Sequence, residues 1–480
     1  MKNFILWMVL FSGAWRCYGQ VEGTQYFMKD LPQVTISNPA FTPLYDYSIG
    51  LPGLSSASAT YNNNGFTYND LVNHTNGTTT ADLDGWKGSL TARNFVTTTA
   101  QTDLMRVGFR TSGKLYFQIS ATARAYARMM LPRELTTLLI QENNSLAGSS
   151  TRFSPKIEGT GWTETALSAA FRVNEHITVG ARLKYLTGIV NATTVRSDMF
   201  VAVGEDYSVD ASADAVLRTS GVRDALSDGY SFRRQIGNYF SNHGVAADIG
   251  LTVQVTEKLK LAASIVDFGR IRWRNNLVDY VLDKQTANYH FAGIDPDKLV
   301  RGDKDYLDNE AENIRDRFNF QKVATSSYST WIPGKAYLSA QYDLTRRFSA
   351  GVLFASEKYY GHAAQGMTVA VTKYFGNVLG TTVSYTVSSR SANNLGTGLS
   401  LNLRPFQFYI VGDNLLNYPI ARLTSKDRNE YPNNTQVFTC RAGLNFVWGL
   451  QKVKADRTSL PKVKSKSKSD SMIRARQRKK

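Results

Sequence analysis

Residues of the kinds that carry out catalysis are few in this sequence and lie far apart. The five histidines form neither an H-E-x-x-H motif nor a pair at helical spacing; they are His74, His176, His243, His290 and His362. A G-x-S-x-G nucleophile elbow and a phosphate-binding loop are also absent from the sequence. We therefore expect a protein that is not an enzyme, with no catalytic residue, no metal site and no cofactor. An enzyme with a triad dispersed along the chain is the alternative.

The two cysteines do not change this expectation. Cys440 falls in a segment that alternates like a β-strand, where a cysteine is more often a small packing residue than a nucleophile. Cys17 falls in an expected signal peptide, so the remaining chain can form no internal disulfide.

Basic residues form a more informative pattern, because they recur on one face of alternating segments whose other face carries no charge. From Leu115 to Ala127 one face carries only Leu, Phe, Ile and Ala, while the other carries Tyr, Gln, Ser, Thr and Arg. If such segments cross a membrane as strands, their central charges must face a lumen, since lipid exposure costs about 2–4 kcal/mol. The basic residues that we expect to line the lumen are Lys114, Arg124, Arg128, Arg182, Lys184, Lys335 and Arg404.

A lumen lined by cations favours an anion, such as a carboxylate head group. The alternative is structural. In that case the cations pair with carboxylates such as Asp248 and Asp343 on the same strands, and with Asp30 and Asp46 near the N-terminus.

The elements that would position these side chains are long strands. Apolar and polar residues alternate in Leu379–Ser388, Leu399–Arg404 and Val245–Val255. Beyond the N-terminal region no apolar run reaches the ~18 residues of a transmembrane helix, yet the chain contains 25 Tyr, 24 Phe and 7 Trp. These features predict an all-β fold, a transmembrane antiparallel β-barrel in which every second residue meets lipid. A soluble β-sandwich also alternates and is the alternative.

Six short polar turns divide the alternating segments into hairpins. They lie around Ser112-Gly113, Asn174-Glu175, Glu257, Arg346, Gly376-Asn377 and Arg404-Pro405. With a first strand near Tyr47–Tyr61 and a last near Val437–Trp448, the hairpins make about 14 strands. Most connections at the other end span tens of residues: 62–102, 129–160, 191–243 and 269–333. Short periplasmic turns and long outer loops are typical of the outer membrane, and an even strand number puts both termini in the periplasm.

The first residues indicate export. Lys2 precedes the apolar stretch Phe4–Phe11, and small residues stand at the −3 and −1 positions of a cleavage before Gln20. We expect a signal peptide at 1–19, an N-terminal plug segment at 20–46, the barrel at 47–449 and a basic tail at 450–480. A lipoprotein signal at Cys17 is the alternative, against which Arg16 counts.

The tail carries much of the formal net charge of +17. Residues 452–480 hold 12 Lys and Arg against Asp456 and Asp470, with almost no apolar residues. Such a block is expected to be a disordered, solvated periplasmic tail. Contact with anionic lipid head groups or acidic periplasmic partners is the alternative. The body is only mildly basic, so its charge does not indicate nucleic acid as a partner.

The last strand resembles a signal for barrel assembly. Arg441, Gly443, Phe446 and Trp448 follow the polar-x-Gly-x-x-aromatic-x-aromatic spacing that the barrel-assembly machinery reads in outer-membrane proteins. Trp448 also falls where an interfacial aromatic girdle is expected. The alternative is an ordinary amphipathic strand, because some 30 residues follow Trp448, whereas the signal usually ends the chain.

The opening of the exported sequence resembles a known family. Gln25–Leu54 reads QYFMKDLPQVTISNPAFTPLYDYSIGLPGL, and weaker matching stretches occur at Leu131–Asn143, Asp267–Gly269 and Val411–Leu416. Together they are similar to a Bacteroidota family of outer-membrane β-barrels of unknown function. That family is similar to the FadL long-chain fatty-acid transporters and to the PorV barrel of type IX secretion. The resemblance covers most of the chain apart from the tail.

The resemblance implies a 14-stranded barrel with an N-terminal segment folded into the lumen as a plug. Asn38, Pro39 and Ala40, followed by Phe41, match an Asn-Pro-Ala element of FadL-like plugs. A simple turn before the first strand is the alternative, because Asn-Pro favours turns. The ligand-contacting residues of FadL do not map onto this sequence, and none is carried over.

These observations favour an outer-membrane barrel that takes up a hydrophobic or amphipathic small molecule, as the FadL resemblance implies. A PorV-like partner barrel in protein secretion, and a structural scaffold without transport, are the alternatives. The expected partners are outer-membrane lipids, the barrel-assembly machinery, and either a hydrophobic ligand or a secretion partner.

Overall fold

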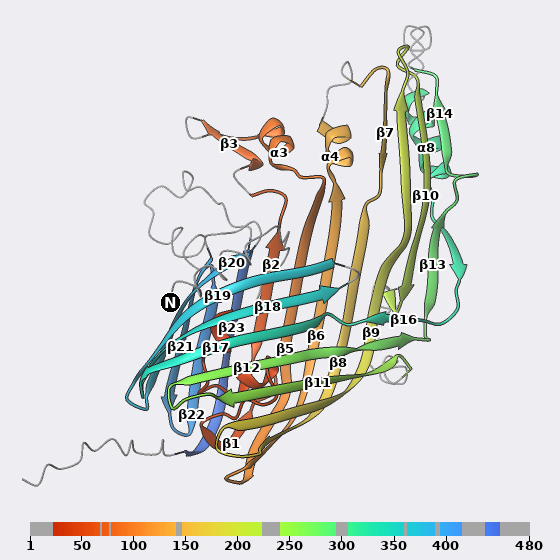
Figure 1. Cartoon of the computed structure of the whole chain (residues 1–480). Coiled ribbons are helices and arrows are strands. Elements are labelled where there is room, and N and C mark those ends of the chain that lie inside the picture. The colour runs from red at the N-terminus through yellow and green to blue at the C-terminus, as the bar shows by residue number, and fades with distance from the viewer. Residues whose placement is uncertain are drawn as a thin grey trace, which may run out of the picture. The chain divides into compact units, whose positions relative to one another are not determined.

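Fourteen antiparallel strands close into a barrel, which confirms the predicted fold class (Figure 1). The first strand is split into β1 (Tyr45–Gly50) and β2 (Ala57–Asn63), which both pair with β5 on one side and β23 on the other. The remaining strands follow in chain order: β5 (Arg93–Ser112), β6 (Leu115–Pro132), β8 (Lys156–Arg172), β9 (Ile177–Val203), β11 (His243–Gln254), β12 (Leu259–Trp273), β17 (Gly334–Thr345), β18 (Phe348–Tyr359), β19 (His362–Phe375), β20 (Leu379–Ser388), β21 (Asn394–Leu403), β22 (Phe406–Asp413) and β23 (Val437–Leu450).

This description rests on a computed structural model of the chain. It describes residues 23–67, 70–75, 78–140, 146–222, 241–293, 306–359, 362–388, 394–414 and 437–451. The predicted signal peptide and the basic tail from residue 452 lie outside the described residues. None of the helices in the described ranges is long and apolar enough to cross a membrane.

All six short turns predicted from the sequence join neighbouring strands at one end of the barrel (Figure 1). The turn between β8 and β9 is closed by a backbone hydrogen bond of 2.9 Å from Val173 N to Ile177 O. In the turn between β11 and β12, Val255 N donates to Leu259 O at 2.9 Å. Such tight connections fix the register of each hairpin, and therefore which side chains face inward.

Burial alternates along the strands as the sequence predicts. On β9, Arg182 and Lys184 are buried, whereas Leu183 between them is 70% exposed. Val245 and Ile249 on β11 are likewise more than half exposed. Polar side chains therefore point into the barrel and apolar side chains point out, which is the reverse of a protein whose barrel wall faces water.

The connections expected at 191–243 and 269–333 contain strands that the alternation did not predict. The outer part of β9 pairs with β7 (Ser149–Phe153) and β10 (Val209–Ser220). β10 pairs with β13 (Leu277–Leu282) and β14 (Asn288–Phe291), and β13 pairs with β15 (Gln321–Ala324). This outer sheet stands beside α8 (Tyr306–Arg317) at the end opposite the short turns (Figure 1).

The outer sheet escaped prediction because its core is small. Its hydrophobic cluster is built from the buried residues Ala213, Ala215, Leu282 and Ala287, so the apolar signal of each strand is weak. Short elements complete the described loops: β3 (Val72–Thr75), β4 (Thr78–Ala81), α3 (Leu83–Ser89), α4 (Arg133–Ile140) and β16 (Tyr328–Trp331).

Residues 23–44 lie against inward-facing side chains of the barrel strands. They include the short helix α2 (Gly23–Tyr26) and a 3-10 turn, η1 (Pro32–Ile36). Tyr26 and Phe41 pack with Val266 of β12, Tyr337 of β17 and Leu353 of β18. Met28 and Leu31 pack with Tyr409 and Val411 of β22. The segment thus contacts strands that are far apart around the barrel.

Candidate functional site

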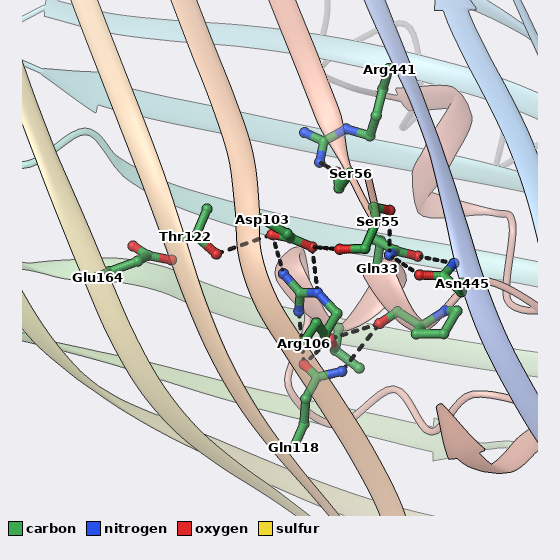
Figure 2. Close-up of polar contacts among 12 residues, drawn as sticks. Gln33, Ser55, Ser56, Asp103, Arg106, Gln118, Thr122, Glu164, Arg441 and Asn445 are labelled. Carbon is green, nitrogen blue, oxygen red and sulfur yellow. Dashed lines mark hydrogen bonds and ion pairs between the residues drawn. The ribbon is translucent and has the colours of Figure 1, made fainter. Parts of the chain in front are cut away.

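An ion pair buried inside the barrel forms the centre of the site (Figure 2). Arg106 Nε lies 2.7 Å from Asp103 Oδ2, and Arg106 Nη2 donates to Asp103 Oδ1 at 2.9 Å. On a regular strand, residues three positions apart face opposite sides. Here the β5–β6 register shifts between Asp103 and Met105, so Leu104 and Met105 are both exposed and the two charges share the inner face.

The β1–β2 connection and the neighbouring strand β6 supply further partners for this pair (Figure 2). The hydroxyls of Ser55 and Thr122 donate to the Asp103 carboxylate at 3.2 and 3.1 Å. Arg106 Nη1 donates to Gln118 Oε1 at 3.0 Å. A buried ion pair of this kind is tolerated only when hydrogen bonds also satisfy its remaining polar atoms.

The N-terminal segment is tied into the same network (Figure 2). The Thr35 hydroxyl donates to Gln118 Oε1 at 2.8 Å. Gln33 and Asn445 exchange two amide hydrogen bonds of 2.7 and 3.1 Å, and Gln33 Nε2 also donates to Ser55 O at 3.0 Å. The segment is therefore fastened to β6 on one side and to β23 on the other.

Two inward-facing glycines make room for the Asn-Pro-Ala element. A Cβ atom on Gly180 would lie 2.2 Å from Pro39 C, and one on Gly250 would lie 2.0 Å from Asn38 Oδ1. Asn38 Oδ1 accepts a hydrogen bond from Ala40 N at 2.8 Å, which is the expected turn chemistry. Only glycine leaves space for the Pro39 backbone at position 180 and for the Asn38 side chain at position 250. That the segment acts as a plug remains a prediction.

A second buried network brings together three of the seven predicted lumenal cations. Its members are Arg124, Arg182, Lys184, Glu164, Asp248 and Asp267. Lys184 Nζ lies 2.9 Å from Asp248 and also contacts Asp267. Arg182 lies 3.1 Å from Asp248 and donates to Thr35 O at 2.6 Å. The three cations balance the three carboxylates, so this part of the interior has no net charge.

Asp267 reaches this network through a local change in backbone conformation. Its φ of 61° lies in the left-handed region, which aspartate adopts more readily than most residues. Val266 and Asp267 are both buried, although they are neighbours on one strand. Arg124 lies 2.9 Å from Asp267 and 3.1 Å from Glu164 as a result. Strict alternation along the sequence would place Asp267 on the outer face of the barrel, because Val266 before it points inward.

The other predicted lumenal cations divide into two groups. Lys335 lies 4.0 Å from Glu357, and Arg128 Nε donates to a threonine hydroxyl of β5 at 3.1 Å. Lys114 and Arg404 are exposed at the β5–β6 and β21–β22 turns and are not at mid-height in the lumen. Their strands alternate correctly, but these residues fall just beyond the strand ends.

A small cavity of about 90 Å³, with many polar residues among those that line it, lies between β2, β5, β6, β8, β17, β18, β19 and β23. Its charged and amide-bearing walls include Gln101, Arg124, Arg128, Trp162, Lys335 and Glu357. We call it the lumenal pocket. Gln101, Arg124 and Trp162 are register partners on three adjacent strands, so rigid elements hold them in one row.

A larger cavity opens in the barrel wall between β12 and β17, and we call it the wall cleft. Ladder pairing stops at Val266 and Lys335 and resumes at Arg270 and Trp331. Pro333 lies in the gap and has no N–H to donate. The cleft has a volume of about 740 Å³ and is lined by outward Ile265, Phe268 and Trp331 as well as by inward Asp267 and Lys335. Lys335 therefore lines both cavities.

Residues 39–413 match a family of proteins of unknown function, DUF5723. The chain belongs to the DUF5723 family. No curated protein matches its sequence.

Several solved barrels are similar to this DUF5723 protein in fold. A TodX deltaS2S3 mutant, a monoaromatic hydrocarbon channel, shares 8% identity at a TM-score of 0.46, over 90% of this chain and 97% of that chain. A FadL homologue from Pseudomonas aeruginosa shares 11% identity at a TM-score of 0.41, with the same coverage. The toluene transporter TodX from Pseudomonas putida shares 9% identity at a TM-score of 0.32, over 90% and 95%. At these values, what those proteins carry has no bearing on the DUF5723 chain.

The residues of the predicted assembly signal all lie on β23. Arg441 is buried, and its Nη1 donates to the Ser56 hydroxyl at 3.1 Å. The rings of Phe446 and Trp448 stack at 6.1 Å with 15° between their planes. A Cβ atom on Gly443 would lie 2.1 Å from a backbone oxygen of the β1–β2 connection. Recognition of this strand by the assembly machinery remains a prediction for the DUF5723 protein.

Several site residues were missed at the sequence level. Asp103 and Arg106 were missed because a bulge changes which face of the strand each residue joins. Gln33 and Thr35 were missed because no local pattern indicates partners that are distant in the sequence. The described residues include no group of three or more His, Cys, Asp or Glu that would hold a metal ion.

Proposed function

We propose that this protein is an outer-membrane barrel that takes up a small amphipathic molecule. In this proposal the lumenal pocket holds the polar head and the wall cleft holds the apolar part. One observation carries it: the two cavities differ in chemistry, yet Lys335 lines both. An amphipathic molecule has the same two-part character, and binding sites combine an apolar lining with a few placed polar groups.

The outward face supports a membrane location for the barrel. Leu183, Val245 and Ile249 are more than half exposed on neighbouring strands, while the charges between them are buried. In water such a surface favours association, whereas in lipid it is the expected lining of a barrel. The proposal includes export by the N-terminal signal and folding by the barrel-assembly machinery. It also includes both termini in the periplasm.

The N-terminal segment supports a route through the wall. Tyr26, Met28 and Leu31 are almost fully buried against the barrel interior, and Gly180 leaves room for the backbone at Pro39. In this proposal the segment blocks the axis of the barrel, so a ligand needs another exit. We therefore propose that it acts as a fixed plug and that the ligand leaves sideways through the wall cleft.

Uptake into proteoliposomes tests this function. Purified barrel is reconstituted and the entry of a fluorescent twelve-carbon amphiphile is followed. Gly334 lines the cleft, and a Cβ atom there would meet nothing closer than 3.6 Å, so Gly334→Trp should fill the cleft and lower uptake several-fold. Leu338→Trp is the matched control, because Leu338 lies on the same strand and is 60% exposed. Equal uptake by wild type and Gly334→Trp would rule out the wall route.

A partner barrel for secreted proteins is the second candidate. The outer sheet supports it, because β10, β13 and β14 extend past the barrel end as a ready platform (Figure 1). One face of that sheet carries exposed ion pairs, Arg196 with Asp214 and Arg152 with Asp198. Isolation of the barrel from its native membrane separates the candidates. A stoichiometric protein partner without any bound amphiphile would favour the partner role over uptake.

A further inference from the structure

The lumenal pocket contains hydrogen-bond donors that find no acceptor within the described residues. The Trp162 indole is only 3% exposed, and its Nε1 has no hydrogen-bond partner there. Gln101 Nε2 and Arg128 Nη1 are also buried without a partner in the described chain. Buried donors are nearly always paired, so three around one small cavity call for a bound group that accepts hydrogen bonds.

Two of the three cations that line the pocket already have carboxylate partners. Arg124 is paired with Glu164 and Asp267, and Lys335 lies 4.0 Å from Glu357. Glu357 itself lines the pocket. A carboxylate head would therefore gain little attraction from Arg124 or Lys335 and would be repelled by Glu357.

Two carboxylates beside the pocket-lining arginines Arg124 and Arg128 also have oxygens that lack a hydrogen-bond donor. Glu164 Oε2 is buried without a partner among the described residues. Glu158 is the register partner of Arg128, and its Oε2 is also buried without a hydrogen-bond partner among the described residues. A carboxylate or an ester only accepts hydrogen bonds, whereas a hydroxyl group both donates and accepts. Hydroxyls from Ser58, Thr60, Thr97 and Thr99 complete the lining and can pair with a hydroxyl in either direction.

We propose that the lumenal pocket recognises an uncharged head group rich in hydroxyls, such as a glyceryl or glycosyl group. The inference rests on the proposed function, since it names the head of the molecule that the barrel takes up. It replaces the anionic head that the run of basic residues suggested. The row of Gln101, Arg124 and Trp162 on β5, β6 and β8 would contact the head directly, from strands that hold fixed positions.

Three probes with the same twelve-carbon chain test the head-group class. They are 1-dodecanoylglycerol, dodecanoate and methyl dodecanoate, which share the acyl chain and differ in the head group. The full-length barrel in lipid nanodiscs is titrated with each probe in competition with a fluorescent twelve-carbon amphiphile. We expect the glycerol ester to bind at least about tenfold more tightly than either of the others, because it alone supplies both donors and acceptors.

Two variants connect this preference to the pocket. Trp162→Phe removes the indole N–H, and Gln101→Leu removes the amide. Each variant should lower the affinity for the glycerol ester by about 3- to 10-fold and leave the affinity for methyl dodecanoate unchanged. Trp448→Phe, on the outward face, is the matched control. Gln101→Leu keeps the test intact if Trp162→Phe does not fold.

The outcomes separate this inference from the function on which it rests. Tighter binding of dodecanoate, or equal binding of all three probes, would contradict recognition of a hydroxylated head group. Neither result would contradict the uptake of an amphiphile. The same holds if neither variant changes the affinity for the glycerol ester. Binding of no probe by a barrel that is folded by its heat-shifted migration in SDS would overturn both.

Discussion

Asp103 and Arg106 lie three positions apart on one strand, yet both point into the barrel, where their side chains form two hydrogen bonds of 2.7 and 2.9 Å. The shared face results from the register shift between Asp103 and Met105. A β-bulge of this kind changes the face to which a side chain points while the two strands stay paired. It brings a charge pair to the place where β5, β6 and the N-terminal segment meet.

Breaking this pair should destabilise the barrel strongly. Arg106→Leu leaves the Asp103 carboxylate buried without its cation, which costs about 3–5 kcal/mol. The measurement is the temperature at which the folded form in SDS converts to the unfolded form. The double variant Asp103→Leu, Arg106→Leu should recover most of the loss, because it removes both charges. A single variant as stable as wild type would show that the pair contributes little.

The fit of the N-terminal segment to the barrel wall gives a second prediction. Gly180→Ala places a Cβ atom 2.2 Å from Pro39 C, so the segment must move away from β9. We expect faster hydrogen exchange in residues 23–44, measured by mass spectrometry, while the strands stay protected. Gly159→Ala is the matched control on β8, where the nearest neighbour of the added atom is 3.9 Å away. Unchanged exchange in the Gly180 variant would contradict a tightly seated segment.

Protonation of Asp30 should also affect the seating of this segment. The Asp30 carboxylate is buried and accepts hydrogen bonds from Ser400, Asn402 and Tyr374, but it has no ion pair in the described part of the chain. Burial raises the pKa of Asp30 above its ordinary value of 3.8. The bound segment therefore gains stability from protonation that is complete below pH 3.8 and is lost as the pH rises through the raised pKa.

Hydrogen exchange of residues 23–44 over a pH series, corrected for intrinsic exchange, measures this effect. Wild type should lose protection as the pH rises above the pKa of Asp30. Asp30→Asn imitates the protonated side chain, so its protection should stay flat and should exceed that of wild type at pH 8. A variant with the same pH profile as wild type would assign the change to other groups.

The sequence predicted the barrel well because alternation and turn chemistry are local signals. Each hairpin shows its own pattern, and six of them fix the strand number. The site depended on features that alternation cannot reveal. The bulge at Leu104 and Met105 and the left-handed Asp267 each change which face a residue joins. The pairing of Gln33 with Asn445 joins residues 412 positions apart, and no local pattern indicates it.

The last strand gives the final prediction. Phe446 and Trp448 stack on the outward face of β23, within the predicted assembly signal. Phe446→Ala should lower the amount of folded barrel in the outer membrane several-fold, measured as the heat-shifted fraction in SDS, because the assembly machinery would read the strand less well. Phe408→Ala on the adjacent β22 removes an exposed aromatic side chain outside the signal and should have a much smaller effect. If both variants reduce folded barrel equally, the loss reflects lipid contact on the outer face, and β23 carries no special assembly signal.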